Sequence, residues 1–344
     1  MTQPDPDLWP HVLSKIAAGT SLDRAEAAAA MRLVMSGEAT PGQVGGLLMA
    51  LRTKGETVEE IEGLADTMLW FANPVAPPVP VVDTCGTGGD RSGTFNISTV
   101  AALVVAGAGV PVAKHGNRAA SSVCGSADLL EALGVRIDLD ATGVERCLAE
   151  AGIAFIFAPV FHPAMGHAAP VRRELRVPTA FNFLGPLTNP ARPFAQVVGV
   201  SDERMLPLMA EVLARRGTRA KLFRGADGID ELTTTGPSKV FEVDAGTVTE
   251  RSTDPAELGL SPATPDDLKG GDPGVAAEIA RAILGGEQGP RREVVLLNAA
   301  AALEVGGRVA SMEEGLTVAA RSIDSGAASA TLERWVVVSA ATSG

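Results

Sequence analysis

The sequence predicts an α/β fold, in which a large domain with a central, mainly parallel sheet flanked by helices is joined to a small all-helical domain. Three observations predict it. Residues 1–72 have a helical pattern throughout, residues 73–80 contain four prolines, and after them apolar runs alternate with helical patterns. Alternating strands and helices imply right-handed crossovers and hence a parallel sheet.

Capping patterns mark the helices of the N-terminal part. Thr40 and Thr57 each precede a run of apolar residues at helical spacing. Three residues after each stands Gln43 or Glu60, which completes a capping box. We therefore expect a helical domain over residues 1–72, serving packing or dimerisation rather than catalysis.

The stretch 73–83 predicts an extended hinge, because proline excludes a helix and stiffens the chain. The α/β domain then covers residues 81–344. Its expected strands are 81–83, 110–113, 135–139, 153–158, 196–200 and 220–223, and its expected helices are 96–108, 126–133, 141–151 and 201–217. Residues 158–195 interrupt the alternation with repeated prolines, and we interpret them as an active-site excursion that rejoins the helical block.

Composition and charge argue against nucleic-acid binding, a disulfide framework, export and a membrane span. The net charge is −12, from 29 basic and 41 acidic residues, and 4% of residues are aromatic, with no Tyr; we therefore expect no nucleic-acid binding. Cys85, Cys124 and Cys147 form neither an even disulfide framework nor a CxxC pair, which favours a reducing cytoplasm. The acidic N-terminus is unlike a signal peptide, and no apolar stretch is long enough to span a membrane. We expect a cytoplasmic protein.

The stretch VVDTCGTGGDRSGTFNIST (81–99) joins an expected strand to an expected helix. It does not match a dinucleotide-binding loop, because Arg91 stands where the last glycine is required. It does not match a kinase-type phosphate loop either, because Thr94 rather than lysine follows Gly93. Its glycines still allow close approach to a ligand, and a helix start attracts anions. A tight turn and an anion-binding loop both remain open.

Two further stretches carry chemistry. KHGNRAASS (114–122) offers cations, an imidazole, an amide and hydroxyls after a short strand, which suits phosphate, although Lys114 and Arg118 also fit a solvated surface. We favour the phosphate role. Asp230 and Glu231 are adjacent in GADGIDELTTTG. By themselves they favour a polar surface turn, but they also fit a hard divalent ion that bridges phosphates.

Five motifs in a fixed order give the chain a family resemblance. They are GTGGD (86–90), TFNIST (94–99), KHGNRAASSVCGSADLLEALG (114–134), FNFLGPLTNPA (181–191) and DELTTTG (230–236). With them the chain resembles the anthranilate phosphoribosyltransferases of tryptophan biosynthesis, from the N-terminal helices nearly to the C-terminus. The resemblance implies that helices from about residues 165–190 complete the N-terminal helical domain, and that a homodimer forms through it.

The reaction that the resemblance implies is transfer of a phosphoribosyl group from 5-phosphoribosyl 1-diphosphate (PRPP) to the amino group of anthranilate. Diphosphate is released with the help of two Mg²⁺ ions per subunit. The implied metal residues are Ser98, Asp230 and Glu231, and the implied anthranilate residues are Gly86, Asn117 and Arg172. The implied PRPP contacts are Gly86, Gly89, Asp90, Thr94, Asn96, Ile97, Ser98, Thr99, Lys114, His115, Gly116, Asn117, Arg118, Ala119, Ala120, Ser121, Ser122 and Ser126.

Departure of diphosphate leaves an oxocarbenium-like sugar, so this chemistry needs charge neutralisation and a well-placed amine. No residue is assigned as an acid or a base: His115 and His162 are expected to position groups, since an aryl amine is already neutral at neutral pH. Arg91 and Pro178 depart from the family pattern without replacing an assigned residue. Two alternatives remain, a pyrimidine nucleoside phosphorylase-like enzyme and a non-catalytic nucleic-acid-binding paralogue of the same fold.

Overall fold

The N-terminal helices begin where the capping residues predict them. The computed structural model describes residues 7–119 and 123–341. The Thr40 amide donates to Gln43 Oε1 at 2.8 Å and the Gln43 amide donates to Thr40 Oγ1 at 3.3 Å; Thr57 and Glu60 form a second capping box. The helices of this part are α1 (Leu8–Ala17), α2 (Arg24–Met35), α3 (Pro41–Lys54) and α4 (Val58–Trp70).

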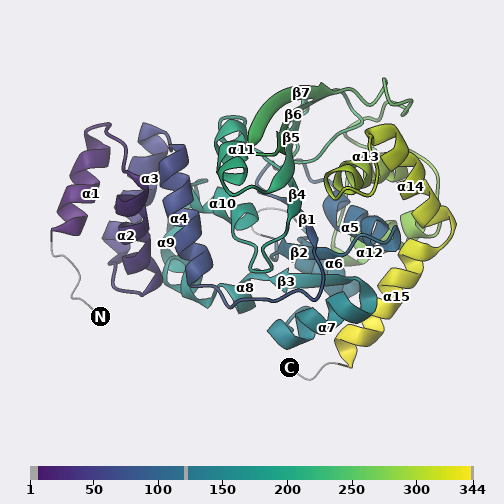
Figure 1. Ribbon diagram of the computed structural model, residues 1–344, viewed down its shortest axis with the longest axis horizontal. Coiled ribbons are helices and arrows are strands. Elements are labelled where there is room, and N and C mark those ends of the chain that lie inside the picture. The colour runs from purple at the N-terminus through teal and green to yellow at the C-terminus, as the bar shows by residue number, and fades with distance from the viewer. Residues whose placement is uncertain (1–6, 120–122, 342–344) are drawn as a thin grey trace.

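One seven-stranded sheet forms the centre of the α/β part (Figure 1). Its strands are β1 (Val82–Gly86), β2 (Val112–Gly116), β3 (Ile153–Phe157), β4 (Ala195–Gly199), β5 (Arg219–Gly225), β6 (Ser238–Asp244) and β7 (Thr247–Thr253). The strand order is β3-β2-β1-β4-β5-β6-β7; the first five are parallel, and β6 and β7 are antiparallel additions. The predicted mainly parallel sheet is confirmed. Gly86 pairs in register with Gly199, so β1 and β4 end side by side.

Helices cover both faces of the sheet. On one face, α5 (Ile97–Gly107) and α13 (Pro290–Val305) pack against the central strands, and α7 (Ala141–Ala151) and α15 (Ala327–Ala340) pack against β3. On the other face, α11 (Met205–Arg215) packs against β5 and β6. The apolar cluster on the α11 side continues without a break into α1–α4. Further helices of the α/β part are α6 (Ser126–Ala132), α12 (Pro273–Leu284) and α14 (Met312–Asp324).

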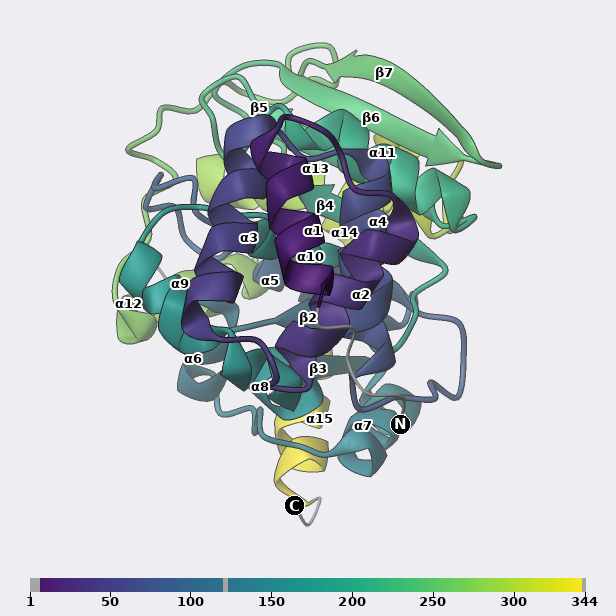
Figure 2. The same cartoon turned by 90° about the vertical axis from the view of Figure 1, so that its left-hand side faces the viewer.

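The proline-rich excursion forms short helices that lie against the N-terminal helices. They are α8 (Ala158–Phe161), α9 (Ala169–Leu175), α10 (Phe181–Leu184) and two 3-10 turns, Pro163–His167 and Gly185–Leu187. Val171, Phe181 and Phe183 are buried in the same apolar cluster as α1–α4. Figure 2, which looks onto the helical end of the molecule, has α9 beside α3, and these two helices are in contact.

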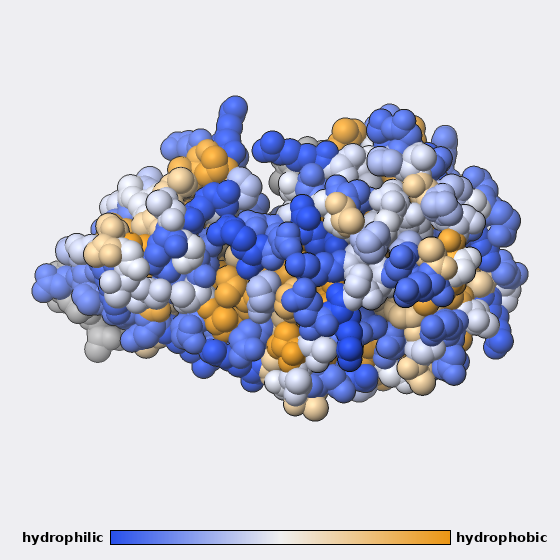
Figure 3. All heavy atoms as spheres, turned by 90° about the horizontal axis from the view of Figure 1, so that it is seen from above, coloured by the Kyte–Doolittle hydropathy of each residue, from blue (hydrophilic) through white to orange (hydrophobic). Residues whose placement is uncertain are grey.

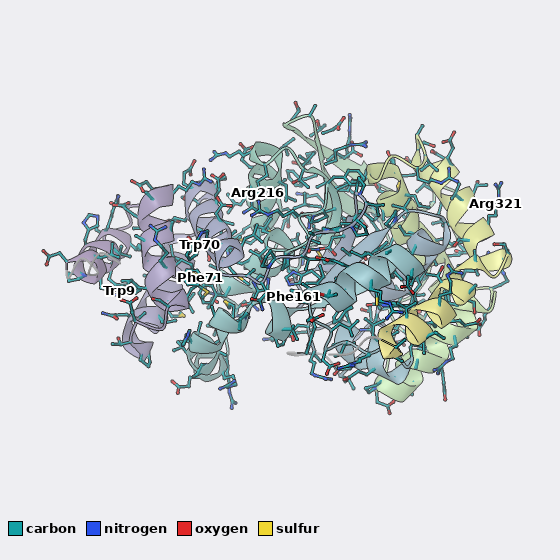
Figure 4. All side chains as sticks on the ribbon, turned by 60° about the horizontal axis from the view of Figure 1, so that its bottom comes forward. Trp9, Trp70, Phe71, Phe161, Arg216 and Arg321 are labelled. Atoms are coloured by element: carbon teal, nitrogen blue, oxygen red, sulfur yellow. The ribbon has the colours of Figure 1, made fainter. Side chains whose placement is uncertain are left out.

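Polar contacts also tie the helical part to the α/β part. Arg216, which follows α11, donates to Asp66 Oδ1 of α4 at 2.6 Å and to the Leu187 carbonyl at 2.6 Å. The extended segment after α4 begins with the Asn73 amide donating to the Phe161 carbonyl at 2.8 Å. In Figure 4, Trp70 and Phe71 lie on the helical part, and Phe161 and Arg216 lie near its border with the α/β part.

The expected strand at 135–139 is wrong. Val135, Ile137 and Leu139 are buried, but the segment pairs with no strand of the described chain, and the Arg136 amide donates instead to Ser339 Oγ at 3.1 Å. Alternating burial shows only that one side of an extended segment packs against the core, which here includes helix α15. It does not require that the segment pairs with a neighbouring strand. The hairpin β6–β7 is absent from the expected strands.

The molecular surface is predominantly polar on the face seen in Figure 3, where hydrophobic residues lie in small separate groups. This agrees with a chain that carries a net charge of −12. In the part of the chain that the structure describes, no helix has the length and apolar character needed to cross a membrane.

Candidate functional site

The glycine-rich loop connects the end of β1 to the start of α5. Gly88, Gly89 and Gly93 have φ values of +67°, +83° and +71°, in the left-handed region that glycine adopts without a steric penalty. Arg91 lies in the same region with φ +60°. The tight turn is therefore real, and it leaves Gly86, Gly88 and Gly89 exposed at the sheet edge, as an anion-binding loop also requires.

The Asp230–Glu231 pair lies across the ends of β1 and β4. The Gly88 amide donates to Asp230 Oδ2 at 2.7 Å, and the Ser98 amide, in the first turn of α5, donates to Glu231 Oε1 at 3.0 Å. Both carboxylates thus touch the glycine-rich loop and its helix. The polar surface turn, which the residues alone favoured, is wrong.

Two glycines make this close approach possible. A Cβ added at Gly199 would overlap the carbonyl oxygen of Asp230, and one added at Gly86 would overlap the Asp230 carboxylate. Gly86 is one of the predicted site residues, whereas Gly199 is not. Gly199 could have been found from its position at the end of an apolar strand, because a glycine there often marks a close approach of another segment.

Replacing Gly199 by Ala is expected to lower the free energy of unfolding by at least about 2 kcal/mol, because the overlapping atom belongs to the backbone and cannot swing aside. Urea unfolding measures the change. Gly166→Ala is the matched control, since an added Cβ there meets nothing within 4 Å. Equal stability of the two variants would contradict the close approach.

The acidic pair has strongly perturbed ionisation. Burial and, as the second cause, the neighbouring Asp90 raise the pKa of Asp230 to about 7. Burial also raises the pKa of Glu231 to about 8, with repulsion from Asp230 as the second cause. A divalent cation between these carboxylates would relieve both effects, so the donor set fits one.

The protein supplies only part of a metal's coordination shell. Within residues 7–119 and 123–341, no three His, Cys, Asp or Glu side chains converge on one point. Mg²⁺ is commonly held by one or two carboxylates, with water and phosphate oxygens as the other ligands. The arrangement therefore suits a cation that arrives with a phosphate-bearing ligand.

The raised pKa values predict that the metal-free protein loses stability as the pH rises. The ordinary pKa values of these two carboxyls are 3.8 and 4.5, so between these values and about 7 to 8 the folded state binds more protons than the unfolded state. Thermal unfolding in EDTA should give a lower Tm at about pH 8.5 than at about pH 5.5. The difference should shrink in Asp230→Asn/Glu231→Gln; an equal difference in that variant would contradict the assignment.

Lys114 lies beneath the loop rather than on the surface. It is 1% exposed in β2, and its Nζ donates to the Thr84 carbonyl and, at 3.2 Å, to Ser98 Oγ. Burial lowers its pKa, and the nearby Asp83 and Glu231 oppose that shift. The solvated-surface alternative is therefore wrong for Lys114, whose charge lies under the start of α5.

His115 and His162 are buried and uncharged at neutral pH. Burial lowers the pKa of His115 to about 3 and that of His162 to about 4. His115 Nδ1 lies 3.0 Å from the Gly185 carbonyl, and the two rings are 5.1 Å apart. Neither imidazole carries a proton that it could donate as a cation near pH 7, which agrees with a positioning role.

The second predicted loop meets the first one. The Thr99 hydroxyl donates to Ser126 Oγ at 3.1 Å, and Asn96 Nδ2 donates to the Cys124 carbonyl at 3.1 Å. The loops that follow β1 and β2 are thereby joined, and most of the predicted phosphate contacts come from them. Ala120, Ser121 and Ser122 lie outside the described residues.

Arg118 is exposed and already paired. Its guanidinium donates to Asp128 at 3.0 Å and to both oxygens of Glu131, at 2.5 and 2.9 Å. The Arg118 amide donates to Asn117 Oδ1 at 2.7 Å. The Arg118 side chain is therefore a solvated, paired surface cation, as one of the two interpretations expects. Its backbone amide, through the bond to Asn117, stabilises the conformation of the loop.

The structure separates the neighbours Arg172 and Arg173. Arg172 on α9 is half-buried, burial lowers its pKa, and its guanidinium carbon lies 5.9 Å from the centre of the Phe181 ring. Among the described residues its side chain has no ion pair or hydrogen bond. Arg173 is exposed. Within residues 7–119 and 123–341, Arg172 is therefore a partly desolvated cation without an anion, as a carboxylate-binding residue would be.

Asp83 is a buried acid that the sequence analysis missed. It is fully buried in β1, where its carboxylate accepts the His115 amide at 3.1 Å and Asn189 Nδ2 at 2.9 Å. It therefore holds β2 and the FNFLGPLTNPA motif together next to Lys114. The signal was a lone acid inside an apolar strand, VVDTC.

Family models match nearly the whole chain. A model described as "Glycosyl transferase family, helical bundle domain" matches residues 10–72, and one described as "Glycosyl transferase family, a/b domain" matches residues 78–329. Anthranilate phosphoribosyltransferase from Saccharopolyspora erythraea is 55% identical over 335 residues, which cover 95% of each chain.

Solved structures agree with this similarity. The anthranilate phosphoribosyltransferase of Thermus thermophilus is 45% identical, with a TM-score of 0.91 over 96% of this chain and 99% of that one. The Saccharomyces cerevisiae enzyme in complex with PRPP and Mg is 27% identical, with a TM-score of 0.90 over 98% and 99% of the two chains. The same yeast enzyme with 4-fluoroanthranilate gives 26% identity and a TM-score of 0.89 over 99% and 100%.

Proposed function

Since this chain belongs to the anthranilate phosphoribosyltransferases of the glycosyl transferase family, we infer that it makes N-(5-phosphoribosyl)anthranilate. It transfers the phosphoribosyl group of PRPP to the amino group of anthranilate, releases diphosphate and serves L-tryptophan biosynthesis. The observation that carries this function is the meeting of Gly88, Asp230 and Glu231 at one sheet edge.

The loops after β1 and β2 form the proposed PRPP cradle. Backbone amides at the exposed glycines and hydroxyls at the start of α5 neutralise phosphate oxygens without covalent chemistry. Lys114 adds a buried positive charge under Ser98. The cradle comprises Gly86, Gly89, Asp90, Thr94, Asn96, Ile97, Ser98, Thr99, Lys114, His115, Gly116, Asn117, Arg118, Ala119, Ala120, Ser121, Ser122 and Ser126.

The proposed metal residues are Ser98, Asp230 and Glu231, for two Mg²⁺ ions per subunit. The raised pKa values of the two carboxyls support this assignment, because bound cations stabilise their charged forms. When bound, Mg²⁺ neutralises the charge of the departing diphosphate. Magnesium in the yeast complex with PRPP supports its use in this family.

The proposed anthranilate site comprises Arg172, Asn117 and Gly86. The planar guanidinium of Arg172 matches the two oxygens of the anthranilate carboxylate, and its partial burial strengthens that pairing. The excursion that carries Arg172 also contacts β2, where the Gly185 carbonyl lies 3.0 Å from His115 Nδ1. The acceptor amine needs no base, and with His115 and His162 uncharged we assign no acid or base.

A homodimer in the cytoplasm is the proposed state of the enzyme. The helical domain, residues 1–72 with helices from about 165–190, would form the interface, joined by the hinge 73–83 to the catalytic domain 81–344. Met49 and Trp70 in the helical part are exposed at 36% and 75%, more than large apolar side chains usually are. Sedimentation velocity should give the mass of two chains; one chain at micromolar concentration would refute the dimer.

The function is tested by following the loss of anthranilate fluorescence. We expect loss only when enzyme, PRPP and Mg²⁺ are all present, and none when any one is omitted. The pyrimidine nucleoside phosphorylase-like alternative instead requires turnover of a nucleoside with orthophosphate. The nucleic-acid-binding alternative requires salt-sensitive DNA binding without turnover.

A further inference from the structure

We propose that Ser201 is a positioning residue for PRPP, which it serves by fixing one peptide plane of the glycine-rich loop. The inference rests on the proposed function. Ser201 lies just after β4 and is not among the residues assigned to any substrate or metal above. It touches the loop at two neighbouring residues, Thr87 and Gly88.

The contacts of Ser201 use both its backbone and its side chain. Its amide donates to Thr87 Oγ1 at 3.0 Å, and its hydroxyl donates to the Gly88 carbonyl at 2.8 Å. The hydroxyls of Ser201 and Thr87 lie 3.1 Å apart. Three short polar contacts therefore join the end of β4 to the middle of the GTGGD motif.

Ser201 itself is firmly held. Arg224 Nε of β5 donates to the Ser201 carbonyl at 3.0 Å, and the Val200 amide donates to the Phe223 carbonyl at 2.8 Å. The residue is thus an extension of the sheet rather than part of a free loop. A rigid element is what a positioning group needs if it is to orient a flexible one.

Gly88 is fixed on both sides. Its amide donates to Asp230 Oδ2 at 2.7 Å, while its carbonyl accepts the Ser201 hydroxyl. Gly88 has φ +67°, and Gly89 follows with φ +83°. Without side chains, these residues have many accessible conformations, so hydrogen bonds must select the one that is used.

The Ser201 contact determines where the Gly89 amide points. The Gly88 carbonyl and the Gly89 N–H belong to the same planar trans peptide, so they point in opposite directions. With the carbonyl turned to Ser201, the N–H points away from Ser201. Within the described residues this N–H donates to no protein group, and Gly89 is exposed. It is a preoriented donor for a phosphate oxygen of PRPP.

Removing the Ser201 hydroxyl should weaken PRPP binding selectively. For Ser201→Ala we expect the Kd of PRPP, measured by isothermal titration calorimetry with Mg²⁺, to rise about 3- to 10-fold, the loss typical of one hydrogen bond. Ser201→Thr keeps the hydroxyl and should restore binding to within about twofold. Ser201→Cys keeps the shape with a weak donor and should bind as Ser201→Ala does. The KM for anthranilate should stay within about twofold throughout.

Ser322→Ala is the matched control. The Ser322 hydroxyl donates to the Val104 carbonyl at 2.8 Å, the same kind of bond at the same length, and its position is buried between α14 and α5. This variant loses stability but should bind PRPP like the wild type. Equal PRPP affinity of Ser201→Ala and Ser322→Ala would overturn the proposal, as would a Ser201→Thr variant no better than Ser201→Ala. A wild type without turnover of PRPP and anthranilate would instead refute the function.

Discussion

Replacing Asp230 by Asn and Glu231 by Gln together is expected to lower kcat/KM by about 1,000-fold or more at millimolar Mg²⁺ while the fold is kept. Amide side chains are poor ligands for Mg²⁺ and carry no charge to bring it to the diphosphate. The fold should survive, because an amide oxygen can still accept the hydrogen bonds from Gly88 and Ser98. Initial rates against Mg²⁺ concentration and circular dichroism measure both parts of the expectation.

The matched control is Glu313→Gln with Glu314→Gln, which removes two adjacent charges from the first turn of α14. It likewise changes two adjacent carboxyls to amides, on a helix that contributes no residue to the proposed site, so kcat/KM should stay within about twofold of the wild type. A comparable loss in both double variants would mean that net charge, not metal binding, explains the effect. Full activity of the Asp230/Glu231 variant would remove the metal assignment.

Local signals in the sequence predict helices best. The Thr40 and Thr57 capping boxes consist of hydrogen bonds between residues that are three positions apart. The residues that determine where each helix starts are therefore close together in the sequence. Strands depend on distant partners. Residues 135–139 alternate like a strand, yet they pair with no strand of the described chain, and the Arg136 amide donates to Ser339 of α15 instead.

The site depends on contacts between segments that are far apart in the sequence. The resemblance named Asp230 and Glu231, but the residues alone favoured a surface turn. Only the register of Gly86 with Gly199, under the Asp230 backbone, brings the pair over the sheet edge. The 1% exposure of Lys114 likewise follows from burial under Ser98 and Thr84, which its position in KHGNR does not reveal.

Arg172→Lys is expected to raise the KM for anthranilate about 10- to 100-fold with a smaller change in the KM for PRPP. A guanidinium binds both carboxylate oxygens with a planar fork, whereas an ammonium is a point charge on a flexible chain. The site is partly desolvated, and among the described residues Arg172 has no competing anion, so its pairing with the substrate is worth more than at the surface. Initial rates over both substrates separate the two KM values.

Arg173→Lys provides the control because the neighbouring residue is the same type on the same helix, α9, but is exposed. Its KM for anthranilate should stay within about twofold of the wild type, since an exposed cation gains little from a carboxylate. If instead Arg173→Lys raised this KM and Arg172→Lys did not, the two roles would be exchanged, and α9 would have to turn about its axis when anthranilate binds. No rise in either variant would point to the positive charge of the helix as a whole, which lysine keeps, with no carboxylate fork at either residue.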